Sequence, residues 1–313
     1  MKPEEGYICC IVNPKAGAIS GSRTGRQFGN YLVERGFEVR VSLTASLEDA
    51  CSIATSAADD RLCAMVVAVG GDGTVSHIAH GLEGSDKPLM IIPCGTENLL
   101  ANELGLDGSL RTAVGTFEAG RIRRLDLGTA NGRCFTSIVG FGFDGSVVGR
   151  VHDSRAGHID YFDYFWPIWR TFWEYRFDPM RVKVDGEEIF DGRALVFVGN
   201  ISRYALGLQI LPAADFGDGL LDVCIYRCAS HLKLLQHSAM TVLKRHAGCG
   251  GVIYRQAKKV TVSAETDIAT QVDGDPGPPL PVELRVLPSA VNCLVPAGGR
   301  PAGIRSRVFR MLE

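Results

Sequence analysis

The sequence predicts two domains, an α/β domain with a parallel sheet followed by a mainly antiparallel β-sandwich domain. The length of 313 residues suits two domains of ordinary size. Strand-like segments alternate with helical ones in the first 125 residues or so, which is typical of a parallel sheet covered on both faces. After that point, short strand-like segments follow one another with few helices between them.

The first half contains four strand-like segments, each followed by a helical one. The strands are expected at 7–12, 37–43, 63–69 and 89–92. The helices are expected at 22–36, 46–58, 74–82 and 97–104. Ser46 is a suitable N-cap for the second helix, because its hydroxyl can accept a hydrogen bond from the helix start. In such an open sheet, ligands bind where strands give way to helices.

The second half is interpreted as a β-rich, substrate-binding domain at 127–287, after a nucleotide-binding domain at 1–126. Antiparallel strands are expected within 126–150, 180–200, 220–227 and 258–287, with one helix near 230–244. The apolar run 291–295 follows the last of them and is expected to return to the first domain, which then also includes 288–313. An exposed edge strand of the β domain could pair with a second copy in a homodimer.

Composition excludes several classes of protein. The chain is 46% hydrophobic and 22% charged, with a net charge of -2, and its basic clusters are short, so no nucleic-acid partner is expected. Ten Cys occur without a Cys-x-x-Cys pair. With no signal peptide apparent, the expected location is a reducing cytoplasm. No apolar stretch reaches ~18 residues, so no transmembrane segment is expected.

The sharpest local signal is the turn Gly70-Gly71-Asp72-Gly73-Thr74, which follows a buried strand and opens a helix. Glycines let backbone N–H groups approach an anion, and a helix N-terminus adds positive partial charge. Asp72 would repel a phosphate unless a metal or a proton lies between them. The turn therefore indicates a Mg²⁺-nucleotide or an activated hydroxyl. The alternative is a tight turn with Asp72 as a helix cap.

Two further loops end neighbouring strands in a similar way. One is Asn13-Pro14-Lys15-Ala16-Gly17, and the other is Pro93-Cys94-Gly95-Thr96-Glu97-Asn98. Each alone is compatible with an ordinary turn. Three such loops at successive strand ends predict a cradle of nucleotide size.

Two acidic turns in the second half are candidates for metal binding and proton transfer. Asp215-Phe216-Gly217-Asp218-Gly219 combines hard oxygen ligands with turn glycines, which suits Mg²⁺ or Ca²⁺. Asp273-Gly274-Asp275 could supply a general base for a hydroxyl nucleophile. The structural alternatives are an acidic β-turn for the first segment and a type I′ hairpin for the second.

Three other patterns carry weaker signals. Gly140, Gly142 and Gly145 match a dinucleotide-binding spacing, but close backbone packing or a wall of an active cleft is the favoured interpretation. His77 and His80 share a helix face and are expected to be solvated or packed. Residues 161–177 hold ten aromatic residues, including all three Trp. They are expected to be core packing, or else a flap that meets acyl chains or a bilayer surface.

Taken together, these motifs resemble those of the diacylglycerol kinase catalytic-domain superfamily. The likeness is to the soluble bacterial diacylglycerol and lipid kinases, with sphingosine and ceramide kinases as relatives, and it covers nearly the whole chain. The resemblance implies an NAD kinase/phosphofructokinase-like first domain. It also implies an ATP- and Mg²⁺-dependent kinase of lipid metabolism and phospholipid biosynthesis, which acts on a diacylglycerol-like or sphingoid-like substrate at a membrane surface.

The resemblance also implies roles for particular residues. The nucleotide would be contacted by Asn13, Lys15, Gly17, Thr44, Gly70, Gly71, Asp72, Gly73, Thr74, Gly95, Thr96 and Asn98. A structural Mg²⁺ would be held by Asp215, Asp218 and Leu220. Asp275 is the expected proton acceptor, with Asp72 as the second catalytic acid.

Two departures from the family pattern stand out. His77 replaces a frequent Glu, and Asp275 is one methylene shorter than the usual Glu. Two other functions stay open at this point. One is a kinase of the same fold group that acts on NAD or another small molecule, and the other is a non-catalytic protein that binds a nucleotide or a lipid.

Overall fold

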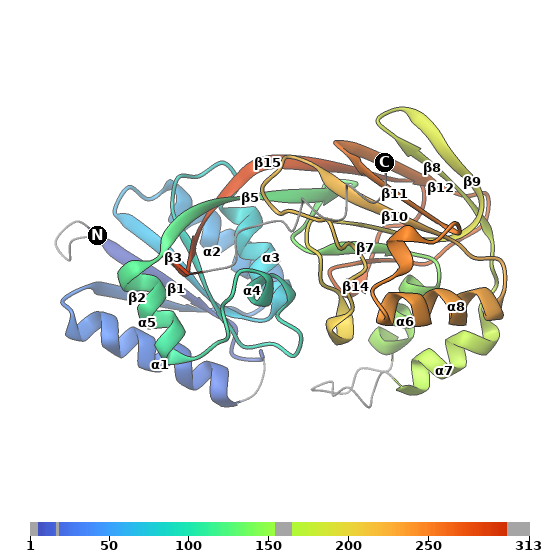
Figure 1. Cartoon of the computed structure of the whole chain (residues 1–313). Coiled ribbons are helices and arrows are strands. Elements are labelled where there is room, and N and C mark those ends of the chain that lie inside the picture. The colour runs from blue at the N-terminus through green and yellow to red at the C-terminus, as the bar shows by residue number, and fades with distance from the viewer. Residues whose placement is uncertain (1–5, 17–18, 154–164, 299–313) are drawn as a thin grey trace. The chain divides into compact units, whose positions relative to one another are not determined.

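The computed structural model describes residues 6–16, 19–153 and 165–298, and these residues form two compact units. Among them, the first unit takes in the chain up to Leu127 and again from Pro288 onward, and the second takes in Gly128–Leu287. Two long strands, β5 (Arg121–Ala130) and β15 (Val282–Val295), carry the chain from one unit to the other (Figure 1).

The first unit is built on a parallel sheet in the order β2-β1-β3-β4. Its strands are β1 (Tyr7–Val12), β2 (Glu38–Leu43), β3 (Cys63–Gly70) and β4 (Leu89–Pro93). β3 is buried along almost its whole length, as expected of a central strand with both faces covered. The end of β15 lies beside β4, where Cys293 pairs with Leu89 in parallel.

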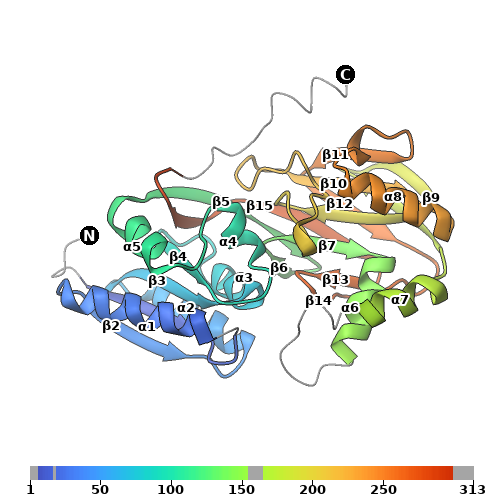
Figure 2. The ribbon, with the colours of Figure 1, turned by 60° about the horizontal axis from the view of Figure 1, so that its bottom comes forward.

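Helices cover both faces of this sheet (Figure 2). The helices are α1 (Ile19–Glu34), α2 (Leu47–Asp59), α3 (Asp72–Gly81), α4 (Leu99–Glu103) and α5 (Leu110–Ala119). Phe28 and Leu32 of α1 pack with Ala113 of α5 against alternate residues of β1, β3 and β4. α2 packs against α3, and small residues such as Ala54 in α2 are fully buried. Small side chains allow such helices to approach closely.

The second unit is built from antiparallel strands. Its strands are β6 (Arg133–Phe135), β7 (Ile138–Phe141), β8 (Pro179–Val184), β9 (Glu187–Gly199), β10 (Leu221–Arg227), β11 (Val252–Ala257), β12 (Lys259–Ser263), β13 (Thr270–Val272) and β14 (Asp275–Pro276). One sheet has the order β14-β13-β7-β9-β10-β11, and the long strand β9 turns from it into a second sheet through β8, β12 and β15.

Two apolar cores flank the first of these sheets. Alternate residues of both sheets, such as Val196 of β9 and Val260 of β12, form a sandwich core. The opposite faces of β7, β9 and β10 form a second core beneath helices, in which Phe172 and Leu234 take part. Those helices are α6 (Phe143–Asp153), α7 (Phe165–Glu174) and α8 (His231–Val242), with short 3-10 turns at Ala205–Gly207 and His246–Gly248.

The predicted fold class is confirmed. The Ser46 cap is also present, with its side chain accepting from the Asp49 N–H at 3.2 Å. Three element predictions were wrong: α5 was not expected, α6 occupies a segment expected to be strand, and the helix expected at 97–104 is the shorter α4. Among the described residues, no helix is long and apolar enough to cross a membrane.

Candidate active site

The C-terminal ends of four strands bring the predicted nucleotide loops to one edge of the first unit's sheet. Each loop is joined to the neighbouring strand by a backbone hydrogen bond. The N–H of Thr44 donates to Val12 O at 2.9 Å, and that of Asn13 donates to Val69 O at 3.0 Å. The N–H of Cys94 donates to Gly70 O at 2.8 Å. These bonds extend the ladders beyond the strands, so the loops are fixed side by side.

The Asn13 side chain links the first loop to the turn after β3. Its Nδ2 donates to Thr74 Oγ1 at 2.9 Å, and its Oδ1 accepts from the Lys15 N–H at 2.9 Å. Thr74 is almost fully buried, whereas Lys15 is exposed. Thr74 is therefore a connection between loops and not a cap of its own helix. Gly17, the last member of this loop, lies outside the described residues.

The two glycine loops touch through their backbones. A Cβ on Gly95 would lie 2.8 Å from the Cα of Gly71, and one on Gly71 would lie 3.2 Å from the Cα of Gly95. Asn98 fixes the second loop, since its Oδ1 accepts from the Gly95 N–H at 2.8 Å and its Nδ2 donates to Gly95 O at 2.6 Å. Asn98 itself is left-handed, with φ 49°, a conformation that Asn tolerates well. Thr96 stands exposed in the same loop.

The start of α3 is suited to an anion. Its N-cap is Gly71, which has no side chain to cap the helix start. The first turn of a helix has N–H groups without intrahelical partners, and these attract phosphate. Asp72 is the first residue of the helix and is half-buried beside Gly73. A carboxylate next to an anion-binding helix start fits a nucleotide that carries its own metal ion.

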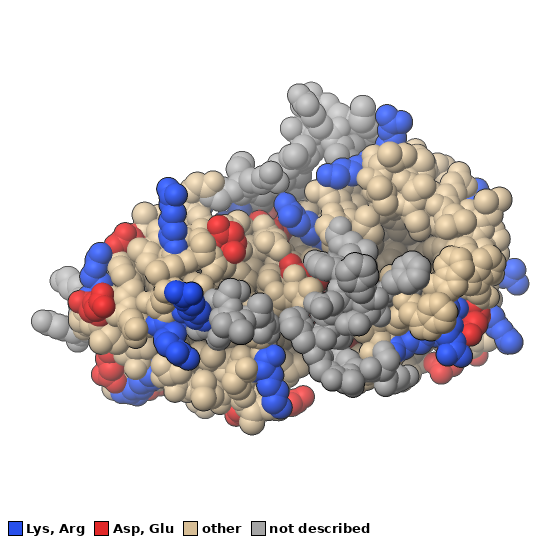
Figure 3. All heavy atoms as spheres, turned by 90° about the horizontal axis from the view of Figure 1, so that it is seen from below, with Lys and Arg blue, Asp and Glu red and all other residues tan. Residues whose placement is uncertain are grey.

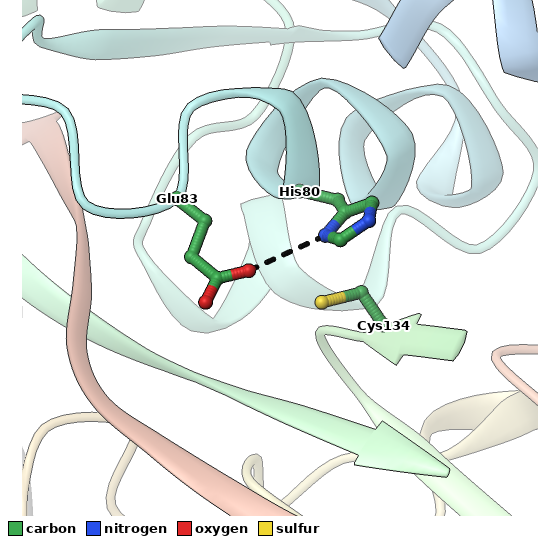
Figure 4. A group of neighbouring side chains, drawn as sticks. All are labelled: His80, Glu83 and Cys134. Atoms are coloured by element: carbon green, nitrogen blue, oxygen red, sulfur yellow. Dashed lines mark ion pairs between the residues drawn. The ribbon is translucent and has the colours of Figure 1, made fainter. Parts of the chain in front are cut away.

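The two His of α3 have separate neighbours. His77 Nδ1 donates to Gly73 O at 2.9 Å, which assigns the proton to that nitrogen. His80 Nδ1 lies 3.5 Å from Glu83 Oε2 at the end of the helix (Figure 4). His77, which stands where the family often has Glu, therefore bonds to the turn that carries Gly73.

Asp275 lies at the end of a tight hairpin in the second unit. β13 and β14 pair with Val272 opposite Asp275, and the two residues between them, Asp273 and Gly274, have φ of 49° and 85°. Two positive φ angles are the mark of a type I′ turn. Arg133 Nη2 lies 3.6 Å from Asp275 Oδ2, and its Nη1 donates to Pro276 O at 2.7 Å. The Asp275 carboxylate, whose side chain is 26% exposed, is thus held beside a cation.

Asp273, two residues earlier, is turned toward the protein. Its carboxylate accepts from the backbone N–H groups of Thr136, Ser137 and Ile138 at 2.8, 2.9 and 3.0 Å. It also accepts from the Thr136 hydroxyl at 3.2 Å. The two acids of this motif therefore have different surroundings, with Asp273 tied to the start of β7 and Asp275 at the hairpin end.

The expected metal-binding turn precedes β10. Asp215 Oδ1 accepts from the Gly217 N–H at 3.2 Å, and Asp218 Oδ1 accepts from the Leu220 N–H at 3.0 Å. Gln256 Nε2 contacts both Asp218 Oδ2, at 3.1 Å, and Asp222 Oδ2, at 3.4 Å. Two carboxylates and a backbone carbonyl within one turn are the oxygen donors that Mg²⁺ prefers.

Asp222 was missed in the sequence, although a charged residue within the apolar run LDVCIY is a usable signal. It is fully buried and accepts from the Tyr254 hydroxyl at 2.8 Å. Burial, together with this carboxylate, raises the pKa of Tyr254 well above its usual range. Asp222 thus helps to position the side chain of Asp218, because Gln256 Nε2 contacts both carboxylates.

The glycine pattern at 140–145 allows close packing, in agreement with the interpretation favoured from the sequence. A Cβ on Gly140 would lie 2.0 Å from Asp144 Oδ2, and one on Gly145 would lie 2.4 Å from Ala269 O. β7 is antiparallel to both of its neighbours, so it does not belong to a parallel dinucleotide-binding unit. Asp144, a partly buried acid, lies beside Gly140 at the start of α6.

Oδ2 of the Asp144 carboxyl group is buried from solvent. The Tyr204 hydroxyl donates to Oδ1, and Gln271 lies on the other side, near Gly140. Burial raises the pKa of Asp144 to about 6, an effect that the contacts with Tyr204 and Gln271 partly offset.

Asp144→Asn is expected to stabilise the protein relative to wild type above pH 6. The folded-state pKa of Asp144 is raised, so the folded protein binds more protons than the unfolded chain between about pH 4 and 6, and wild-type stability falls across that interval. A shift of about two pKa units corresponds to ~3 kcal/mol. Thermal unfolding from pH 4 to 8 measures the difference in stability between Asp144→Asn and wild type, with Asp267→Asn, at an exposed residue, as control. A difference that stayed constant across this pH range would contradict the raised pKa of Asp144.

Comparisons with known proteins agree with this architecture. Residues 7–130 match the model of the diacylglycerol kinase catalytic domain, and residues 137–295 match that of the YegS C-terminal NAD kinase beta sandwich-like domain. A Mycobacterium tuberculosis protein named diacylglycerol kinase is 32% identical over 303 residues, which cover 95% of this chain and 97% of that protein. A Bacillus subtilis protein of the same name is 26% identical over 290 residues, covering 91% of this chain and 95% of that protein.

A solved structure shows the same fold. The crystal structure of a diacylglycerol kinase from Bacillus anthracis covers 96% of this chain and 100% of its own, with a TM-score of 0.71 and 20% sequence identity. The match to the sandwich domain confirms the second half of the predicted fold class. From the two matched domains and the near full-length relatives it follows that the chain belongs to the diacylglycerol kinase catalytic-domain family.

Proposed function

We propose that this chain is a kinase that transfers the γ-phosphoryl group of ATP to the hydroxyl of a diacylglycerol-like lipid. The observation that carries the proposal is the contact between the loops of Gly71 and Gly95 beside the start of α3, whose N-cap is a glycine. A backbone-lined pair of loops of this kind binds phosphates through N–H groups. The relatives named diacylglycerol kinase support a lipid as the acceptor.

The proposed nucleotide contacts are those of the four loops at the edge of the first unit's sheet. Backbone N–H groups of Gly71 and Gly73 would receive the phosphates, since these positions have no side chains to obstruct them. Gly95, whose own N–H already donates to Asn98 Oδ1, would let the phosphates come close to the second loop. Lys15 is an exposed cation on the adjacent loop. The remaining contacts would come from the other predicted residues, Asn13, Gly17, Thr44, Gly70, Thr74, Thr96 and Asn98.

Mg²⁺ would be held in two places. Asp72 would hold the ion that accompanies the nucleotide, and such an ion neutralises charge on the transferred phosphoryl group. Asp215, Asp218 and the carbonyl of Leu220 would hold a second, structural ion, since their oxygens fit its preference. The hydrogen bond from Gln256 to Asp218 would keep that carboxylate in place.

Asp275 is the proposed proton acceptor. A general base must come within hydrogen-bond reach of the hydroxyl whose proton it removes. The carboxylate of Asp275 is partly exposed, directly after the two-residue turn of the hairpin. Positioning of the substrates and neutralisation of the phosphate charge would supply most of the rate acceleration, because the protein forms no covalent bond to the phosphoryl group in such a direct transfer.

A labelled-product assay tests this function. The chain is incubated with Mg²⁺, radiolabelled ATP and, separately, diacylglycerol, sphingosine, ceramide, phosphatidylglycerol and NAD. Labelled phosphatidic acid is expected as the main product, and Asp72→Asn is expected to lower its rate of formation by at least about a hundredfold.

Three outcomes would contradict the proposal. Labelled NADP without any lipid product would indicate a small-molecule kinase of the same fold. Binding of Mg-ATP without transfer to any of these acceptors would indicate a binding protein. Full turnover by a folded Asp72→Asn variant would remove that residue from the proposed site.

A further inference from the structure

We propose that α7 and the start of α8 form a docking surface for a lipid bilayer that contains anionic headgroups. α7 bears Trp166, Trp169 and Trp173 on one side, at spacings of three and four residues. Their exposed fractions are 66%, 49% and 62%. Indoles are favoured at the boundary between headgroups and acyl chains, whereas exposure to water of three on one helix is costly. The expectation that this aromatic segment is core packing was therefore wrong for these three side chains.

The other side of α7 anchors the helix in the second unit. Phe172 of α7, and Tyr175 and Phe177 just after the helix, pack against the core beneath the helices. The ring of Phe172 lies 5.2 Å from that of Trp173, edge to face. A shallow groove of about 330 Å³ runs between the three Trp side chains. The packing of Phe172 therefore holds α7 in place, with its three Trp side chains directed outward.

The start of α8 extends the apolar surface. The ring of His231, its first residue, lies 5.1 Å from that of Phe172 and 6.3 Å from that of Trp173, so the start of α8 lies beside α7 (Figure 1). Leu232 and Leu235 follow, with exposed fractions of 77% and 55%. The docking surface, defined as these two Leu and the three Trp, therefore combines side chains from two adjacent helices.

Charge on the two helices favours an anionic partner. α7 and the segment 231–245, which comprises α8 and the turn after it, contain the cations Arg170, Lys233, Lys244 and Arg245 and a single acid, Glu174. Glu174 is paired with Arg150 and with Arg170. The view from below shows mainly uncharged surface on this side of the second unit, with charged side chains along its border (Figure 3).

This combination distinguishes a bilayer from a second copy of the chain. Exposed aromatic and aliphatic side chains accompanied by Lys and Arg are typical of helices that lie in the interface of an anionic membrane. A twofold dimer through the same surface would bring the cations of one copy toward those of the other, with the one acid already paired. The surface would bring the protein to the bilayer in which a lipid substrate resides.

The chain's own fluorescence tests the proposal, because its three Trp are all on this surface. The full chain without nucleotide is titrated with vesicles of phosphatidylcholine and phosphatidylglycerol at about 7:3. The Trp emission is expected to shift to the blue and to be quenched by lipids brominated near the headgroup. Binding to vesicles of phosphatidylcholine alone is expected to be weaker than binding to the mixed vesicles. Added salt is expected to weaken binding to the mixed vesicles, because it screens the attraction between the Lys and Arg side chains and the anionic headgroups.

A matched variant locates the effect. Leu232→Gln/Leu235→Gln leaves all three Trp in place and is expected to weaken vesicle binding about tenfold or more, because two exposed Leu no longer enter the bilayer. Val33→Gln, an equally exposed apolar residue in α1 of the first unit, is expected to leave binding unchanged. No emission shift with anionic vesicles, a shift that follows protein concentration without lipid, or equal weakening by both variants would overturn the proposal. None of these readouts requires kinase activity.

Discussion

Asp275→Asn is expected to lower the rate of phosphoryl transfer to a lipid hydroxyl by about 10²–10⁴-fold, the range for loss of a general base. Asn is nearly the same shape as Asp but cannot accept the proton. Arg133 can still donate to Pro276 O in the variant, so the hairpin should keep its conformation. Initial rates of labelled product with saturating Mg-ATP measure the effect, and near-ultraviolet circular dichroism checks the fold.

Asp275→Glu is the matched control for this prediction. It introduces the side chain that the family resemblance implies at this position, one methylene longer, and retains a carboxylate. We expect its rate to stay within about tenfold of wild type, since a general base of similar strength is kept. If the Asn variant turned over at the wild-type rate while remaining folded, the proton acceptor would have to be sought elsewhere.

The parallel half of the fold could be predicted because its signals are local. β3 is a continuous apolar run, and Gly70–Thr74 follows it directly, so the strand, the turn and the helix start are all written in one short segment. α5 was missed because it follows α4 without a strand between them. α6 was missed because the strand-like run before Gly140 gave no sign that the chain would turn into a helix at Phe143.

The site was predictable as a set of residues, but not as a set of contacts. The sequence does not predict that Asn13 donates to Thr74. The two residues meet because β1 and β3 are neighbours in the folded sheet, although they are 61 positions apart in the chain. Similarly, the motif Asp273-Gly274-Asp275 contains two acids in equivalent-looking positions. The type I′ turn and the pairing of β13 with β7 determine that Asp273 is directed toward Ser137. Such information lies in register and not in composition.

Asp273→Ala is expected to destabilise the protein by about 4 kcal/mol, because it removes the acceptor for three backbone N–H groups. Ser137 and Ile138 are fully buried, and each N–H left without a partner costs ~1–3 kcal/mol. For a unit of this size, such a loss lowers the melting temperature by roughly 10 °C. Differential scanning calorimetry measures the shift, and urea titration gives the free energy of unfolding.

Asp273→Asn separates the hydrogen bonds from the backbone conformation. Asn keeps one oxygen acceptor and tolerates the left-handed φ of 49° at this position, so about half of the destabilisation is expected. Asp273→Ala combined with Asp275→Asn should lie within about 1 kcal/mol of Asp273→Ala alone, because the second substitution removes only the partly exposed ion pair with Arg133. A melting temperature for Asp273→Ala within about 2 °C of wild type would contradict the structural role, since even one unsatisfied buried N–H should lower it further.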